Sequence, residues 1–208
     1  MIDSVTLVTY ILVVLGFVFI PGPATLLTVA RATSSGTQAG IATGLGIACG
    51  DIIHTTMAVF GLSALIYASA FLFSLVKYAG AAYLVYLGIR AIIAKAPAGL
   101  SLDTAHRSAA AAFRQAIVTE VLNPKTALFF LAFLPQFVRP ENGAVQLQLA
   151  TLGLILVALG LLSTIAFAVG AGRIGSLLRR NPAVLRWQGR VVGAIYCTLG
   201  LRLALQEK

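Results

Sequence analysis

The sequence places a few ionisable and polar side chains inside long apolar runs, and these residues are the first candidates for chemistry. Asp51 lies in one run and is followed one helical turn later by His54, while Glu120, Asn123 and Lys125 lie in another. An acid and a lysine in an apolar medium can offset each other, or can together bind a solute that carries both charges. Asp51, Glu120 and His54 can also exchange protons. A static ion pair and a hydrogen-bonded interior histidine remain alternative interpretations.

The first apolar run is interrupted by "IPGPAT", which places Gly22 between Pro21 and Pro23. Proline has no N–H to donate, so in a helix the carbonyls of Phe17 and Phe19, four residues earlier, lose their usual partners. Gly22 permits backbone angles that other residues rarely adopt. In lipid, unpaired backbone is tolerated only against protein or a water-filled cavity. We therefore expect a broken helix that faces a polar cavity.

The stretch "LNPKTALFF" interrupts a second apolar run in the same way, because Pro124 frees the carbonyl of Glu120. One kinked helix is common, but two breaks at corresponding places favour a functional role. With a rise of about 1.5 Å per residue, Asp51, Asn123 and Lys125 are expected ~15–18 Å into their spans. The acid, the lysine and the broken backbone are therefore predicted to surround one cavity near the middle of a membrane.

Composition indicates the medium in which these runs lie. Of 208 residues, 59% are hydrophobic and only 10% are charged, whereas soluble domains carry roughly 25% charged residues. The chain is therefore predicted to be an integral membrane protein embedded in a lipid bilayer. Its net charge of +9 does not indicate nucleic acid, because the basic residues lie between the apolar runs. The first run is too long for a signal peptide and lacks a basic start, so we expect a retained helix.

About 20 apolar residues cross a ~30 Å hydrocarbon core, and this length predicts an all-α, polytopic domain of about six transmembrane helices over residues 1–208. The predicted spans are residues 4–30, 41–68, 71–94, 113–137, 145–171 and 184–204. A polar link at 95–112 separates a first three-helix half, 1–94, from a second half, 113–208.

Loop charges predict the orientation of the chain. Lys and Arg gather in the connections at 31–40, 90–114 and 172–190, which the positive-inside rule assigns to the cytoplasm. Both termini are therefore expected on the outer, periplasmic side. A count of five spans instead of six would move one terminus to the other side.

Short repeats relate the two halves. The matching stretches are "GAAY" at 80–83 and "GAIY" at 193–196, "LGIR" at 87–90 and "LGLR" at 199–202, and "PAT" at 23–25 and "PKT" at 124–126. Since each half has three spans, the second half would cross the membrane inverted relative to the first, with helices 1 and 4 interrupted at corresponding places. Chance similarity between helices rich in small residues is the alternative.

Glycines in the second span follow a spacing of four, at Gly36, Gly40 and Gly44 and again at Gly46 and Gly50. Such spacing lets helices approach closely. We expect these glycines to serve helix packing rather than ligand contact, and the pattern also permits a homodimer.

The predicted cavity suits a zwitterion. Free carbonyls and a carboxylate can hold a cation, whereas Lys125 and the N–H groups after a helix break can hold an anion. An amino acid is the simplest solute with both charges.

Several motifs resemble the lysine exporter (LysE/RhtB) family of small amino-acid efflux proteins. They are "PGPATLL", "GLGIACGD", "KYAGAAYLVYLGIRA" and "NPKTALFFLAFLPQF", in this order within the first 137 residues. The resemblance implies export of amino acids across the bacterial inner membrane, driven by the proton gradient. It carries functional interest onto Pro21, Gly22, Pro23, Asp51, Asn123, Pro124 and Lys125. Since few acids lie within the predicted membrane spans, a neutral substrate such as homoserine, threonine or leucine is favoured.

Other functions remain open at this stage. Within transport, the alternatives are export of basic amino acids or of metal cations. A membrane-embedded enzyme would need a metal cluster or a nucleophile with its base, and the chain has only two histidines, His54 and His106. A non-transporting assembly protein would not need paired breaks at depth. We expect no cofactor and no resident metal, with Asp51 as the first candidate for proton coupling and Glu120 as the second.

Overall fold

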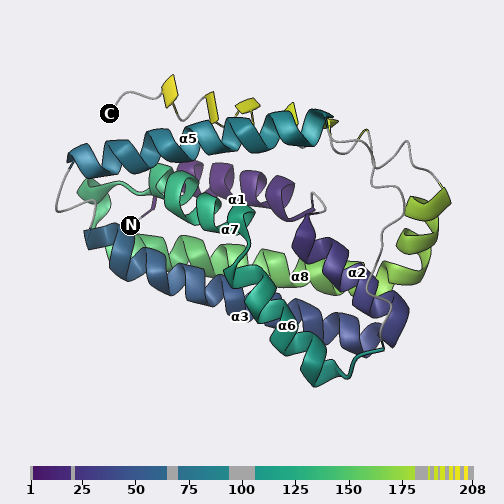
Figure 1. Cartoon of the computed structure of the whole chain (residues 1–208). Helices are drawn as coiled ribbons and strands as arrows, with labels where there is room; N and C mark the ends of the chain where they lie inside the picture. Colours follow the sequence, from purple (N-terminus) through teal and green to yellow (C-terminus); the bar gives the residue numbers. More distant parts are fainter. Residues whose placement is uncertain are drawn as a thin grey trace.

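The computed structural model describes residues 2–19, 22–64, 70–93 and 106–180, and individual residues between 187 and 205. All elements in this part of the chain are helical, as the sequence predicts, and they lie alongside one another in a bundle (Figure 1). Pro21, most of the predicted link at 95–112 and most of the predicted sixth span lie outside the described residues.

The first predicted span is two helices, α1 (Ser4–Phe19) and α2 (Pro23–Ser35), which are bent by 49° relative to each other. Gly22 has extended backbone angles and caps α2, whose first residue is a proline, a position where the missing N–H is not needed. The sequence predicts a connection over residues 31–40. In the structure, α2 and α3 (Thr37–Met57) cover all of this range except Gly36, whose φ of 91° makes the turn between the two helices.

The fourth predicted span is also broken. Helix α6 (Ala109–Val121) ends just before Asn123, and α7 (Pro124–Leu128) begins with a proline, so that the two parts of the span are bent by 44°. The chain then continues through a π-helical turn, Phe129–Phe133, and a 3-10 turn, Leu134–Phe137. The two interruptions therefore occur where the proline motifs predict them.

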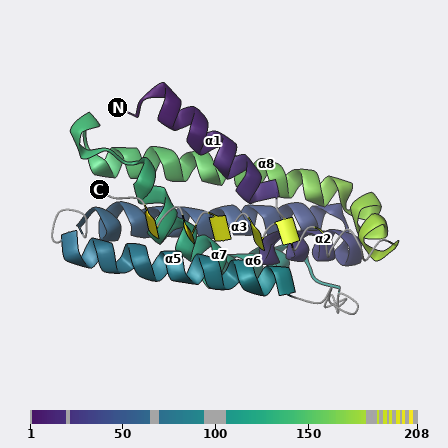
Figure 2. The same cartoon turned by 90° about the horizontal axis from the view of Figure 1, so that it is seen from above.

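Two further helices of the described residues, α5 (Ala70–Ile93) and α8 (Val145–Arg180), belong to the bundle, and α3 continues in a π-helical turn, Ala58–Leu62. Helix α3 lies between α2, α6 and α8 and packs against all three (Figures 1 and 2). Helix α3 therefore contacts both broken spans, the first through α2 and the second through α6 and α7.

The glycines of α3 account for this close packing. A Cβ atom added at Gly44 would lie 2.8 Å from Thr164 Oγ1 on α8, and one at Gly50 would lie 2.6 Å from Glu120 Cβ on α6. A Cβ at Gly46 would collide with the backbone carbonyl of Phe113. The prediction that these glycines serve packing is confirmed for all but Gly36, which forms the turn before α3.

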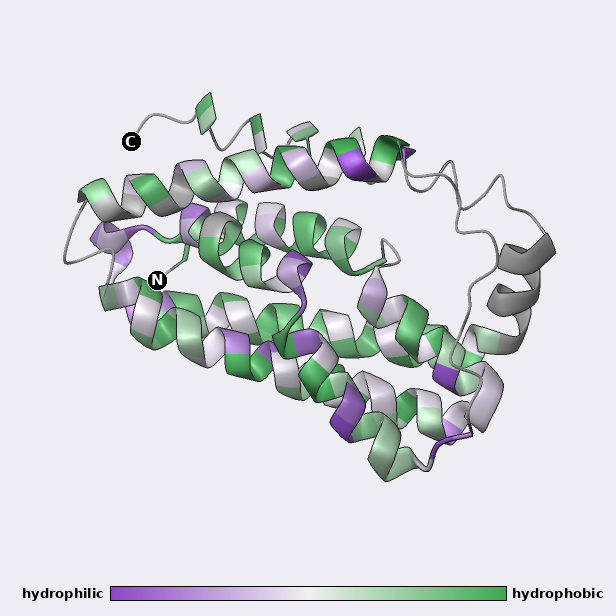
Figure 3. Cartoon of the chain, in the orientation of Figure 1, coloured by the Kyte–Doolittle hydropathy of each residue, from purple (hydrophilic) through white to green (hydrophobic). Residues whose placement is uncertain are grey.

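The surface of the bundle is apolar. Large hydrophobic side chains are mostly exposed along its helices, for example Val5, Phe60, Phe71, Leu147 and Leu162. Figure 3 shows hydrophobic residues along all the helices, with strongly hydrophilic ones at few positions. Such a surface is suited to lipid rather than water, and the chain is a membrane protein.

Two described helices, Thr37–Leu62 and Val145–Ala171, are each long and apolar enough to cross a membrane. The two bent pairs raise this number to four if each pair forms one span. The count of six spans and the orientation of the termini stay predictions.

The repeated motifs of the third and sixth predicted spans meet in space. A Cβ at Gly88 would lie 2.6 Å from the carbonyl oxygen of Gly193, and one at Gly200 would lie 2.8 Å from that of Ala81. The two segments therefore run antiparallel, and the contacts are reciprocal, as a two-fold relation between the segments requires. The inverted relation between the two halves stays a prediction.

Candidate substrate cavity

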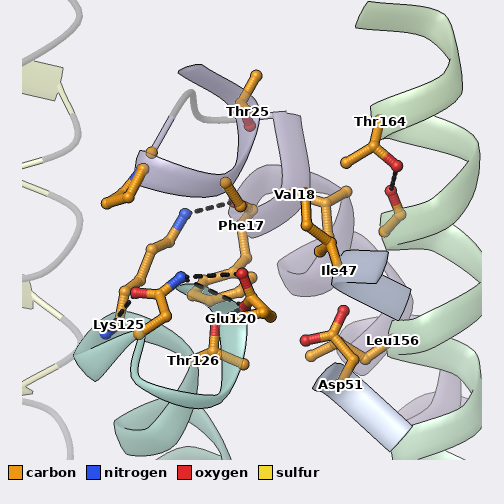
Figure 4. A pocket seen from close by; sticks show the side chains of 15 residues that line it. Phe17, Val18, Thr25, Ile47, Asp51, Glu120, Lys125, Thr126, Leu156 and Thr164 are labelled. Carbon is orange, nitrogen blue, oxygen red and sulfur yellow. Dashed lines mark hydrogen bonds between the residues drawn. The ribbon is translucent and has the colours of Figure 1, made fainter. Parts of the chain in front are cut away.

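A cavity lies between the two helix breaks (Figure 4). Its walls come from the end of α1, the start of α2, and from α3, α6, α7 and α8. Its polar lining side chains are Thr25, Asp51, Glu120, Asn123, Lys125, Thr126 and Thr164. The space open to water-sized molecules is about 50 Å³, which is enough for a few waters. An amino acid would require the walls to separate.

Lys125 connects the two breaks. It is the second residue of α7, and its Nζ donates a hydrogen bond of 3.1 Å to the carbonyl of Phe17 at the end of α1 (Figure 4). The same ammonium lies 4.1 Å from the centre of the Phe17 ring. The sequence predicts that the carbonyl of Phe17 lacks a helical donor, because Pro21 has no N–H. Lys125, from the other predicted half, donates to this carbonyl instead.

The carbonyl of Val18 has a side-chain donor as well, since it accepts a hydrogen bond of 3.0 Å from Ser163 Oγ on α8. The last carbonyls of a helix have no partner within the helix. Side chains from α7 and α8 therefore satisfy two of the carbonyls at the broken end of α1.

Glu120 is the centre of the second break and is almost fully buried. Its carboxylate accepts hydrogen bonds from Asn123 Nδ2, at 3.2 and 3.3 Å, and from the Thr126 hydroxyl. Its backbone carbonyl, to which Pro124 has no N–H to donate, accepts from the backbone N–H of Asn123 at 3.0 Å and from His54 Nε2 at 3.1 Å. In this bond His54 Nε2 is the donor, because a carbonyl oxygen only accepts, and His54 therefore supports the backbone of Glu120.

Asp51 lies on α3 with its side chain in the cavity and is only 4% exposed. The carboxyl groups of Asp51 and Glu120 line the same cavity as the ammonium of Lys125, so that charge–charge interactions couple the three groups. Two acids and one base thus share a small buried space. This arrangement can hold a proton, an ammonium group or both, while Lys125 provides a positive charge for an anion.

The start of α2 is a second part of the cavity wall whose chemistry suits an anion. Gly22 and Pro23 line the cavity, and the N-cap residue of this 13-residue helix, Gly22, has no side chain that could cap the first turn. Free N–H groups at a helix start bind anionic groups. By contrast, the start of α7 is already capped, because Asn123 Oδ1 accepts from the N–H of Lys125 at 3.1 Å.

Most of the site residues predicted from the sequence therefore come together. Those that line the cavity are Gly22, Pro23, Asp51, Glu120, Asn123 and Lys125. Pro124 starts α7 and His54 supports Glu120, both next to the cavity rather than in its wall, and Pro21 lies outside the described residues.

Sequence reasoning missed several members of the wall. The two threonines, Thr25 and Thr126, occupy the same place in the repeated motifs "PAT" and "PKT", and this repetition was the available signal. Leu156, Gly160 and Thr164 follow each other every four residues on α8 and share one face. No feature of that long apolar run marks the face that meets the cavity.

The lipid-facing helical bundle with a buried charged cavity defines a multi-pass membrane protein. The family model of the LysE type translocators matches residues 15–207. The chain therefore belongs to this family of translocators, which are transporters and not enzymes.

Three relatives illustrate the similarity. An uncharacterized membrane protein of Vibrio cholerae is 29% identical over 94% of both chains, and membrane protein YrhP of Bacillus subtilis, also uncharacterized, is 36% identical over 76% of this chain and 79% of its own. The homoserine/homoserine lactone efflux protein of Salmonella typhimurium is 28% identical over 88% of both chains. No solved structure matches the chain.

Proposed function

We propose that the protein is a secondary transporter that exports neutral amino acids across the bacterial inner membrane in exchange for protons. One observation carries this proposal: Asp51, Glu120 and Lys125 line one cavity between two broken helices. Sites at the junction of interrupted helices are a recurring feature of secondary transporters. The relative named for homoserine and homoserine lactone efflux supports a small amino-acid-like substrate.

The charges of the cavity favour a neutral amino acid. When the two acids hold one proton between them, that proton and Lys125 balance the two negative charges. A zwitterion adds no net charge to this site. Its carboxylate would lie at Lys125 and the start of α2, and its ammonium group would lie at Asp51 and Glu120.

Exchange follows from competition for the same carboxyl groups. With one proton already shared by the two acids, a second proton and the substrate ammonium group compete for the remaining carboxylate, so binding of one disfavours the other. Asp51 is the first candidate for the coupling group, because hydrogen bonds from Asn123 and Thr126 already engage the carboxylate of Glu120.

The test is transport by purified protein in liposomes loaded with a panel of neutral amino acids, basic amino acids and divalent metals. We expect a proton gradient to drive efflux of neutral amino acids, and the Asp51→Asn variant to insert normally but to lose this coupled efflux. Normal proton-driven efflux by that variant would refute the role of Asp51, and efflux of metals alone would refute the function.

Export of basic amino acids is the second candidate, and the two acids in the cavity are the observation that favours it. A dibasic substrate would use both carboxyl groups and release more than one proton. The panel separates the two candidates directly. A metal cation is disfavoured because the Lys125 ammonium shares the cavity, and because the described residues bring together no group of three or more His, Cys, Asp or Glu.

A further inference from the structure

The wall that α8 contributes to the cavity has a gap in it. Leu156 and Thr164 present side chains, but Gly160 between them presents none. A Cβ atom added at Gly160 would lie 3.5 Å from Asp51 Oδ2 and 3.9 Å from Val18 Cγ1. These are ordinary van der Waals distances, so a methyl group fits there without moving its neighbours.

Gly160 differs in this respect from glycines that serve helix packing. On the same helix, a Cβ at Gly153 would lie 2.7 Å from Thr55 Oγ1, and on α3 one at Gly44 would lie 2.8 Å from Thr164 Oγ1. Those two glycines are required for helices to approach each other. The space at Gly160 is instead part of the cavity, next to the carboxyl of Asp51.

The apolar part of the cavity lies at this gap. Figure 4 shows Val18, Ile47 and Leu156 near Asp51, on the side of the cavity away from the body of Lys125. If the substrate places its ammonium at the acids and its carboxylate at Lys125, its side chain faces this apolar wall. The free volume in front of Gly160 then limits the length of that side chain.

We propose, on the basis of the proposed function, that Gly160 is a specificity-determining residue which sets the largest amino-acid side chain that the protein transports. Each methyl group added to the wall takes the place of about one methylene group of the substrate. Hydrophobic pockets discriminate between substrates that differ by one methylene by roughly 10- to 200-fold. The effect of one added carbon at the wall on relative transport rates is therefore large enough to measure.

The experiment uses the full-length protein in liposomes and a homologous series of straight-chain 2-amino acids, from alanine to 2-aminohexanoate. Gly160→Ala should reduce transport of the longest member that the wild type accepts by about tenfold or more relative to alanine. Val18→Ala widens the same wall and should shift the preference toward longer members. The double variant should return it toward the wild-type profile.

Gly16→Ala is the matched control, because a Cβ at this position of α1 meets no atom within 4 Å. We expect it to leave the profile unchanged. Size-exclusion chromatography in detergent and thermal unfolding show whether each variant is folded.

The outcomes distinguish the two proposals. A wild type that transports no member of the series refutes the proposed function and the inference with it. A wild type that transports the series, with Gly160→Ala showing the same profile or an equal loss for all members, refutes only the role of Gly160. If Gly160→Ala does not fold, Val18→Ala decides, and an unchanged preference in that variant overturns the inference.

Discussion

Replacement of Lys125 by methionine tests whether this side chain holds the two broken helices together. Methionine keeps most of the length and the apolar stem but removes the ammonium. The carbonyl of Phe17 would lose the donor that lies 3.1 Å away, and the contact with the Phe17 ring would be lost as well. The positive charge that attracts Asp51 and Glu120 would also disappear.

The expected cost follows from these contacts. A hydrogen bond from a charged donor contributes about 1.5–3 kcal/mol. The cation–π contact adds about 0.5–2 kcal/mol, depending on how far the pair is shielded from water. Removing a buried charge also relieves its desolvation penalty, which reduces the net loss of stability. We expect a net loss of about 2 kcal/mol in the free energy of unfolding, which for a chain of this size corresponds to a Tm about 4–8 °C lower.

Thermal unfolding in detergent measures this shift, with Arg139→Met as the matched control. Arg139 Nη1 lies 3.9 Å from Glu141 Oε1 in an exposed ion pair. Such pairs contribute little to stability. The control should therefore unfold within about 0.5 kcal/mol of the wild type. A Tm for Lys125→Met that equals or exceeds the wild-type value would show that the contact with Phe17 does not stabilise the break.

Two further predictions concern residues away from the cavity. Gly46→Ala should destabilise the protein by about 1–3 kcal/mol, because the new methyl group meets backbone that cannot rotate away, whereas Gly61→Ala, with no atom within 4 Å, should leave the Tm unchanged in the same unfolding assay. At the start of α1, backbone and side-chain hydrogen bonds from Thr6 lower the pKa of Asp3 below its usual value of 3.8. The stabilisation of this first turn is therefore present above that value and is lost as the pH falls through the lower pKa of the folded state. Amide hydrogen exchange at Thr6, corrected for the intrinsic rate, should show this loss in the wild type but not in Asp3→Asn.

The helix breaks could be predicted from the sequence because proline acts through local geometry. Pro23 and Pro124 each begin a new helix where the motif predicts one. The missing N–H also identifies the carbonyl that needs another donor, and the structure shows donors at the two carbonyls of Phe17 and Glu120. Asn123, which donates its backbone N–H to Glu120, is local, but the local rule does not give the side-chain donors, since Lys125 and His54 lie more than 60 residues away in the chain from the carbonyls they contact.

The connection at 31–40 shows where sequence reasoning was less successful. Basic residues mark the cytoplasmic side, but they do not show whether a side chain faces water. Arg31 lies within α2, is only 1% exposed, and donates hydrogen bonds to Gln115 Oε1 of α6 from Nε at 3.2 Å and from Nη2 at 2.8 Å. Its burial depends on how α6 packs against α2, which no local pattern encodes.

The two breaks are held by side chains from opposite predicted halves. Lys125 of the second half binds the carbonyl of Phe17 in the first, and His54 of the first half binds the carbonyl of Glu120 in the second. In the proposed transporter, a substrate carboxylate competes with the Phe17 carbonyl for Lys125, and a substrate ammonium competes with a proton for the acids beside His54. In that proposal, binding would weaken the bond that joins α1 to α7, and the event that fills the cavity would free the two halves to move relative to each other.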